Sequence, residues 1–331
     1  MRELISRRGL SVLLAGFALA AATTGWAEDS VRNWLDRMSR AVETLDYKGT
    51  LVHVHNGQVD TLKIVHRADD SGVRQRIYSI DGARREVIRS GDSVRCFFPG
   101  DEPTMLESQL AGRLMPALPV SRLLGPDSGY QMTLGDTERV AGMTARVVNI
   151  QPRDAYRYGS RLWLEERTGM LLRYALVDHD GNRIQQLSFT AIELGAKISD
   201  AELEPELSGR HFAIRSADEA LRSGSAPVTP ISVQPQVPSG FRLVNAGRGH
   251  GTDGNEFEHL LFSDGLSSFS IYIEPAAGKS TDAGIEALGP VHVYTTRSTG
   301  YQYTVIGEVP AETVGYVGRQ LRHGSRQSVR H

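Results

Sequence analysis

The spacing of apolar and polar residues changes several times along the chain, and each change predicts a different element. Apolar residues recur at helical spacing over residues 30–45, which predicts one amphipathic helix. Beyond it the period is two residues, and pairs such as Asn56-Gly57 and Asp81-Gly82 provide hairpin turns. Because these connections are too short for crossover helices, we expect an antiparallel meander. Its predicted strands cover residues 50–55, 60–66, 73–80, 85–89 and 93–98.

An apolar segment over residues 103–124 interrupts this meander. Pro103, Pro116 and Pro119 break it, so it does not fit one regular core helix. Two interpretations stay open: the segment closes one end of the sheet, or it forms a mobile lid over an apolar cavity. Acyl chains are the natural ligand of such a cavity, because each buried methylene contributes ~0.8 kcal/mol. The large apolar residues of the segment are Met105, Leu106, Leu110, Leu114, Met115, Leu118, Leu123 and Leu124.

Alternation resumes after the interruption and then stops again at a segment rich in proline and serine. The strands predicted before that segment cover residues 130–134, 144–151, 160–165, 171–177 and 183–193. Residues 216–238 have the composition of an extended linker. Beyond it, predicted strands over residues 241–245, 258–262, 267–274, 291–296 and 301–309 and a helix over 311–321 indicate a smaller α+β domain. We therefore expect a first domain over 28–215, a second over 239–324 and a basic tail over 325–331.

Residues 1–27 have the three parts of a secretory signal peptide. Arg2, Arg7 and Arg8 precede a short apolar run, and Gly25-Trp26-Ala27 offers a cleavage site. The run is shorter than the roughly 20 apolar residues needed to cross a bilayer. The arginine pair also resembles a twin-arginine signal, so the export route stays open. The mature protein is expected in an exported compartment.

Composition narrows the function. The 331-residue chain is 40% hydrophobic and 23% charged, as in a globular protein, and its 37 Lys and Arg against 39 Asp and Glu leave a net charge of −2. This balance argues against nucleic acid as the main partner. The single cysteine, Cys96, excludes an internal disulfide and a cysteine-based zinc cluster. No G-x-S-x-G, HExxH, P-loop or GxGxxG motif occurs, so we expect neither an enzyme nor a cofactor.

Three histidines offer the one pattern that suggests a metal. His53 and His55 share a strand face, and His66 lies on the next strand. The alternative is a polar outer face opposite Val52 and Val54, which would point inward by the same alternation. No carboxylate stands at a fixed offset from the histidines, so we favour this alternative and expect no metal site.

Several sequence runs, in order along the chain, resemble one known family. They are Tyr47-Lys48-Gly49-Thr50-Leu51-Val52, Asp81-Gly82-Ala83-Arg84-Arg85-Glu86-Val87-Ile88-Arg89, Cys96-Phe97-Phe98-Pro99, Glu258-His259-Leu260-Leu261-Phe262-Ser263-Asp264-Gly265 and Gly307-Glu308-Val309-Pro310. Together they are similar to the RseB/MucB family of periplasmic regulators of the envelope-stress sigma factor. The resemblance extends over nearly the whole mature chain.

The resemblance implies both a fold and a function. The fold is an N-terminal LolA/LolB-like unclosed antiparallel β-barrel wrapped around helices, followed by a smaller C-terminal α+β domain. Such a protein binds the periplasmic domain of a membrane-bound anti-sigma factor of the RseA/MucA type and protects it from site-1 proteolysis. Lipid or lipopolysaccharide binding relieves this repression. The alternative is a periplasmic lipid or lipoprotein carrier of the LolA/LolB type, because fold similarity alone does not fix function.

Candidate site residues follow from alternation and position, and the family motif does not fix them. Catalytic residues are not expected, and a homo-oligomer remains open. The basic cluster around Arg85 and Arg89 is either solvated or meets an acidic peptide or a lipid phosphate. The partner candidates are Arg85, Arg89, His259, Phe262, Asp264 and Gly265. The lipid candidates are Val52, Val54, Leu62, Ile64, Val94, Phe98, Met105, Leu110, Leu114 and Met115.

Overall fold

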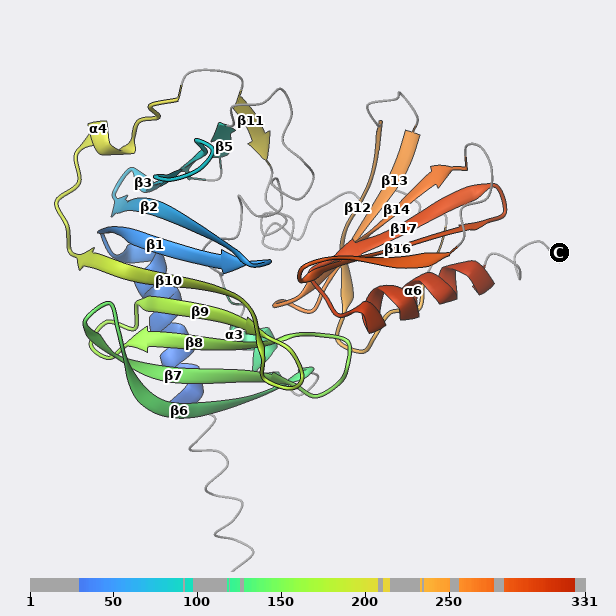
Figure 1. Cartoon of the computed structure of the whole chain (residues 1–331), viewed down its shortest axis with the longest axis horizontal. Helices are drawn as coiled ribbons and strands as arrows, with labels where there is room; N and C mark the ends of the chain where they lie inside the picture. Colours follow the sequence, from blue (N-terminus) through green and yellow to red (C-terminus); the bar gives the residue numbers. More distant parts are fainter. Residues whose placement is uncertain are drawn as a thin grey trace, which may run out of the picture.

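The computed structural model contains two antiparallel β-sheets, each with a helix packed on it (Figure 1). It describes residues 30–91, 93–97, 118, 120–125, 128–207, 211–214, 233, 235–250, 256–276 and 283–324. The predicted signal peptide, most of the predicted linker and the basic tail lie outside these residues. Within the described ranges, no helix is long and apolar enough to cross a membrane.

The first sheet has the strand order β11-β5-β4-β3-β2-β1-β10-β9-β8-β7-β6. Every neighbouring pair is antiparallel. The outermost strands β11 and β6 do not pair with each other, so the expected unclosed antiparallel sheet is confirmed. The strands are β1 Tyr47–His55, β2 Gln58–Asp69, β3 Gly72–Ser79, β4 Glu86–Ser90, β5 Ser93–Phe97, β6 Tyr130–Val140, β7 Met143–Pro152, β8 Gly159–Glu165, β9 Leu171–Val177, β10 Arg183–Leu194 and β11 His211–Ile214.

The helix over residues 30–44 packs against the part of this sheet formed by β6 to β9 (Figure 1). Val31, Leu35 and Met38 are spaced by four and three residues, which places them on one helical face. They are buried in one core with Leu162 and Leu164 of β8. The sheet curves around this helix, as the resemblance implied (Figure 1).

The end of the apolar segment closes this core. Leu118 is 7% exposed and Leu123 2%, and both pack with the helix over 30–44. Leu123 belongs to the short helix α3 Val120–Leu123. These two residues therefore belong to the core of the first domain, and most of the remaining segment lies outside the described residues. Four lipid candidates of the segment, and Phe98 before it, lie outside the described residues: Met105, Leu110, Leu114 and Met115.

The residues of β1 that face the interior of the first domain are not the ones that we expected. The ladder between β1 and β2 is regular, so every second residue of β1 shares one face. Tyr47 and Leu51 on that face are completely buried, whereas Val54 on the other face is 37% exposed. The expectation that Val52 and Val54 point inward is therefore wrong. Both faces of β1 carry apolar residues, and the larger side chains occupy the interior.

The second sheet has the order β12-β13-β14-β17-β16-β15 and carries helix α6 Ala311–Gly324. Val314, Val317 and Leu321 lie on one helical face and pack with Tyr294 and Val305 of the sheet. The strands are β12 Arg242–His250, β13 Glu256–Ser263, β14 Ser268–Pro275, β15 Gly284–Leu288, β16 Val291–Ser298 and β17 Tyr301–Gly307.

Sequence reasoning missed two strands and a short helix. β11 is only four residues long, which is too short for alternation to be recognised, and β15 is exposed along its whole length, so it has no buried face that produces alternation. β6 also continues to Val140, past an irregularity in its pairing after Leu134. The short helix α4 Asp200–Leu203 begins at Ser199, which forms a capping box with Glu202.

Candidate functional site

A polar cluster joins the two domains. The loop between β7 and β8 carries Arg157, whose side chain is completely buried although it is charged. Arg157 Nη1 donates to Asp264 Oδ2 at 2.7 Å, and Asp264 belongs to the tight turn between β13 and β14 of the second domain. Arg157 Nη2 also donates to the carbonyl of Ser239 at 2.6 Å. One side chain therefore binds two separate segments of the second domain.

The two carboxylate oxygens of Asp264 accept hydrogen bonds from different domains. Its Oδ1 accepts backbone N–H bonds from Leu266 at 2.9 Å and Ser267 at 2.8 Å, which fixes the turn. Its Oδ2 accepts the hydroxyl of Tyr130 at 3.0 Å in addition to Arg157. The sequence pair Asp264-Gly265 therefore lies in a hairpin turn, and this turn docks onto the first domain.

Residues of the first domain hold the Arg157 guanidinium in place. Asp154, three residues earlier, accepts from Arg157 Nε at 3.0 Å. Gly129 is required beside it, because a Cβ on Gly129 would lie 2.1 Å from Arg157 Nη1. The guanidinium carbon also lies 4.9 Å from the ring centre of Phe241, at the start of the second domain. We call Tyr130, Arg157, Ser239, Asp264 and Ser267 the interdomain joint.

Burial changes the pKa values of two groups in the interdomain joint. Burial raises the pKa of Asp264, opposed by the backbone N–H of Ser267 and by Arg157. Burial and the neighbouring Asp264 carboxylate also raise the pKa of Tyr130 well above its usual value. A buried ion pair contributes little net stability, because both charges lose their hydration, but it requires both partners. The interdomain joint therefore requires one geometry of its partners. When the domains separate, water hydrates the charged groups again.

Further contacts surround the joint. Thr313 Oγ1 of α6 donates to the carbonyl of Tyr156 at 2.7 Å, and Gln185 Nε2 of β10 donates to Glu308 Oε1 at 2.9 Å. Leu266 of the second domain packs against the core beneath β6 to β9. The Tyr156 and Tyr316 rings also meet, with centres 5.3 Å apart. The contact between the domains thus combines hydrogen bonds, an ion pair and apolar packing.

The partner candidates are not brought together. Phe262 is 6% exposed and stacks on Phe269 with ring centres 5.3 Å apart, so it is a core residue. His259 accepts or donates a hydrogen bond with Ser270 Oγ at 2.9 Å, and Asp264 and Gly265 form the docked turn. Arg85 is exposed in the first domain, and Arg89 lies on β4. Sequence reasoning missed Arg157 and Tyr130, because their partners are more than 100 residues away in the chain.

Three of the described lipid candidates share the inner face of the sheet. Leu62 and Ile64 pair with Leu51 and Gly49 across β1 and β2, and Ile64 is completely buried. Val94 of β5 is 7% exposed. Val52 and Val54 lie on the opposite face of β1, which separates them from these three.

A polar groove of about 400 Å³ lies over β6 and β8 to β10. The Arg161 and Arg173 guanidinium carbons each lie 5.1 Å from the Trp163 ring centre, and Glu138 accepts the Trp163 indole N–H at 2.8 Å. Its lining residues are Glu138, Arg161, Trp163, Arg173, Ala175, Val177, Gly181, Asn182, Arg183 and Gln186. This groove is not the apolar cavity of the second interpretation above, because polar and charged side chains form most of its lining.

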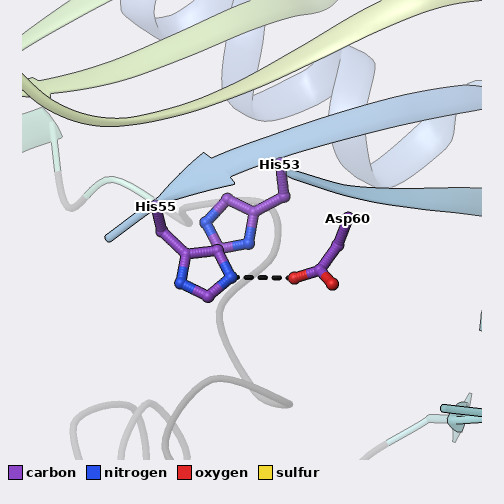
Figure 2. Close-up of side chains that lie close together, drawn as sticks. All are labelled: His53, His55 and Asp60. Carbon is purple, nitrogen blue, oxygen red and sulfur yellow. Dashed lines mark hydrogen bonds and ion pairs between the residues drawn. The ribbon is translucent and has the colours of Figure 1, made fainter. Parts of the chain in front are cut away.

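His53 and His55 converge on a carboxylate that the sequence argument did not find (Figure 2). Asp60 lies opposite His53 in the ladder between β1 and β2, and His55 Nε2 is 2.8 Å from Asp60 Oδ2. His66 lies apart from them: it stacks on Tyr47 and bonds the carbonyl of Leu45. The hairpin register, which single-sequence spacing does not give, produces this cluster.

Both halves of the chain match known domain families. The MucB/RseB N-terminal domain matches residues 30–207, and the MucB/RseB C-terminal domain matches residues 232–322. The sigma factor AlgU regulatory protein MucB of Pseudomonas aeruginosa is 32% identical over 320 residues, which cover 94% of this chain and 96% of the relative. The sigma-E factor regulatory protein RseB of Escherichia coli K12 is 26% identical over 302 residues, covering 88% and 91%.

Solved structures agree with this match. The complex structure of Pseudomonas aeruginosa MucA/MucB has a TM-score of 0.71 and 29% identity, and the similarity covers 87% of this chain and 96% of that chain. The crystal structure of MucB in complex with MucA(peri) has a TM-score of 0.69 and 29% identity, covering 86% and 96%. On these matches, which include both domains, the chain belongs to the MucB/RseB family.

Proposed function

We propose that this chain is a periplasmic regulator that binds the periplasmic segment of a membrane-bound anti-sigma factor. Binding protects that segment from site-1 proteolysis and so represses an envelope-stress sigma factor. The observation that carries the proposal is the similarity, over both domains, to MucB in its complex with MucA(peri). The signal peptide over residues 1–27 supports export to the periplasm. The chain acts in this function by binding and has no catalytic step.

Lipid or lipopolysaccharide is the releasing signal in this proposal. The acyl chains are bound by apolar residues of the first domain, for which we propose Leu62, Ile64 and Val94 on the inner face of the sheet. The further candidates are Met105, Leu110, Leu114 and Met115. Burial of apolar chains supplies the affinity, since each methylene contributes ~0.8 kcal/mol.

The interdomain joint is the element that couples the two ligands. A lipid can displace the anti-sigma segment only if the two ligands prefer different arrangements of the domains. Arg157 and Asp264 are buried when the domains are docked, and both regain hydration when the domains separate. A polar joint of this kind favours one arrangement of the domains by a small free energy only, so the domains can still reorient.

The test is a protease-protection assay with purified components. Residues 28–331 are mixed with the periplasmic segment of the cognate anti-sigma factor and the site-1 protease, and cleavage is followed with and without lipopolysaccharide. We expect the chain to slow cleavage and lipopolysaccharide to restore it. Cleavage at an unchanged rate in the presence of the chain would overturn the proposal.

Two variants separate a regulator from a lipid carrier. Leu114→Asp with Met115→Asp places charge in the apolar segment, and Val59→Asp, at a residue that is 61% exposed, is the matched control. We expect the double variant to protect the segment even in lipopolysaccharide, and the control to behave like the wild type. Transfer of lipid between vesicles without any effect on cleavage would favour the carrier instead.

A further inference from the structure

Two imidazoles and one carboxylate meet at the end of the first hairpin. His53 and His55 are two residues apart on β1 and share a face, and β2 places Asp60 opposite His53 (Figure 2). One donor atom from each of the three residues lies within 4.8 Å of the others. Two histidines on one strand face with a carboxylate on the paired strand form a three-point donor set, because the ladder fixes all three backbones.

The donors are of the type that borderline divalent cations prefer. Imidazole nitrogen and carboxylate oxygen suit Zn²⁺, whose bonds to these ligands are about 2.0–2.2 Å long. The two imidazoles are stacked, with ring centres 4.4 Å apart and planes 22° apart. Coordination of one ion by both imidazoles requires the rings to turn out of this stack. Three protein ligands leave one tetrahedral position for water.

Solvent reaches the donor atoms of the cluster. The side chains of His55 and Asp60 are 18% and 31% exposed, so an ion can reach them from solvent. The donor side chains are thus partly buried and still accessible to an ion.

The residues around the cluster belong to both domains. Gln185 hydrogen-bonds to His53, and its amide also donates to Glu308 of the second domain at 2.9 Å. Outer residues that hold a ligand ring in place add to the affinity of a metal site. Beside the cluster, Asn56 meets Gly289 of the second domain, where a Cβ would clash with its amide.

We propose that His53, His55 and Asp60 form a binding site for one Zn²⁺ ion at the edge of the contact between the domains. This revises our expectation from the sequence, which lacked the carboxylate. The site is independent of anti-sigma factor binding, so either can exist without the other.

The test uses residues 28–331 without a histidine tag and titrates them with ZnSO₄ in a calorimeter at neutral pH. We expect one equivalent to bind to the wild type. His53→Gln and Asp60→Asn should each weaken binding at least tenfold, the scale of a disrupted metal site. Co²⁺ in place of Zn²⁺ should give the visible absorption of a four-coordinate ion, and this absorption should be lost in both variants.

His250→Gln is the matched control. His250 also lies near a carboxylate, with Nε2 3.6 Å from Glu256 Oε1, but both side chains are about 70% exposed. Along β12 and β13, no second histidine shares the face of this pair. This variant should bind Zn²⁺ like the wild type. No binding by the wild type, or binding that survives in both His53→Gln and Asp60→Asn, would overturn the proposal. Thermal unfolding of each variant identifies any loss that is due to misfolding, and Asp60→Asn, which keeps the shape of the side chain, then decides.

Discussion

Arg157 is completely buried, and its hydrogen-bond partners come from both domains. A buried guanidinium without its carboxylate is costly, whereas a buried pair replaced by neutral groups costs little. The stability of the joint therefore depends on the pairing of Arg157 with Asp264 and less on the presence of either charge.

Arg157→Leu should lower the free energy of unfolding by about 3–5 kcal/mol, because it leaves Asp264 buried without its cation. Arg157→Leu with Asp264→Asn should recover much of this loss, since the amide is neutral and its oxygen can still accept the backbone bonds of the turn. Urea unfolding of the wild type, both single variants and the double variant measures the coupling. Equal losses in Arg157→Leu and the double variant would show that the charge pairing is unimportant.

The burial of His66 leads us to expect that mild acid destabilises the first domain. Burial lowers the pKa of His66 below 6.5, and its Nδ1 bonds the carbonyl of Leu45 at 2.9 Å. Below pH 6.5 the unfolded chain takes up a proton that the folded chain resists, so this contribution to stability is present above pH 6.5 and is lost as pH falls toward the lower folded value. We expect the urea midpoint of the wild type to fall between pH 7 and pH 5.

His66→Asn tests the source of that fall. The asparagine amide can donate to the Leu45 carbonyl and does not titrate, so the decline between pH 7 and pH 5 should be smaller than in the wild type. His179→Asn, at an exposed turn, is the control and should decline like the wild type. An identical decline in all three proteins would assign the acid sensitivity to other groups.

At the scale of elements, helix α6 is held against its sheet by a close approach. A Cβ on Gly318 would lie 2.0 Å from Cδ1 of Tyr294 on β16, whose ring is 6% exposed. A Cβ on Gly315, one turn earlier, would meet the flexible end of Arg319 at 2.9 Å and Ile285 at 3.2 Å. Two glycines in one helix thus have different reasons to be there.

Gly318→Ala should destabilise the second domain by about 1–3 kcal/mol, because the methyl group forces the Tyr294 ring or the helix to move. Gly315→Ala should be close to neutral, since a helix propensity gain of up to ~1 kcal/mol offsets a mild contact. Thermal unfolding of the two variants beside the wild type checks the difference. A Gly318→Ala variant as stable as Gly315→Ala would mean that the helix can shift freely on the sheet.

Hairpins were the elements that sequence predicted best. β1, β2 and β9 follow turn pairs and alternation closely, because short loops and a two-residue period are local signals. The prediction of which face of β1 is buried was wrong, because Leu51 and Val52 are both apolar. Only the neighbouring strands decide which of the two is buried. The Arg157–Asp264 contact spans 107 residues, so no local pattern could have predicted it.

At the scale of the whole molecule, the domains touch at a second place besides the joint. The turn at Asn56 meets the turn at Gly289, where a Cβ on Gly289 would lie 2.4 Å from Asn56 Cγ. Since Cβ and Cγ of Asn56 are bonded about 1.5 Å apart, the two Cβ atoms would be no more than about 4 Å apart, within the range of a disulfide. The native Cys96 is completely buried, and burial raises the pKa of its thiol to about 11, so it should not compete.

Asn56→Cys with Gly289→Cys therefore offers a reversible staple for the docked arrangement of the domains. If lipopolysaccharide releases the anti-sigma segment by changing that arrangement, the oxidised variant should protect the segment from cleavage yet fail to release it. Reduction with dithiothreitol should restore release, and each single cysteine variant should behave like the wild type. Release by lipopolysaccharide from the oxidised protein at the wild-type rate would place the competition within one domain, because a staple that fixes both domains cannot block a local exchange of ligands.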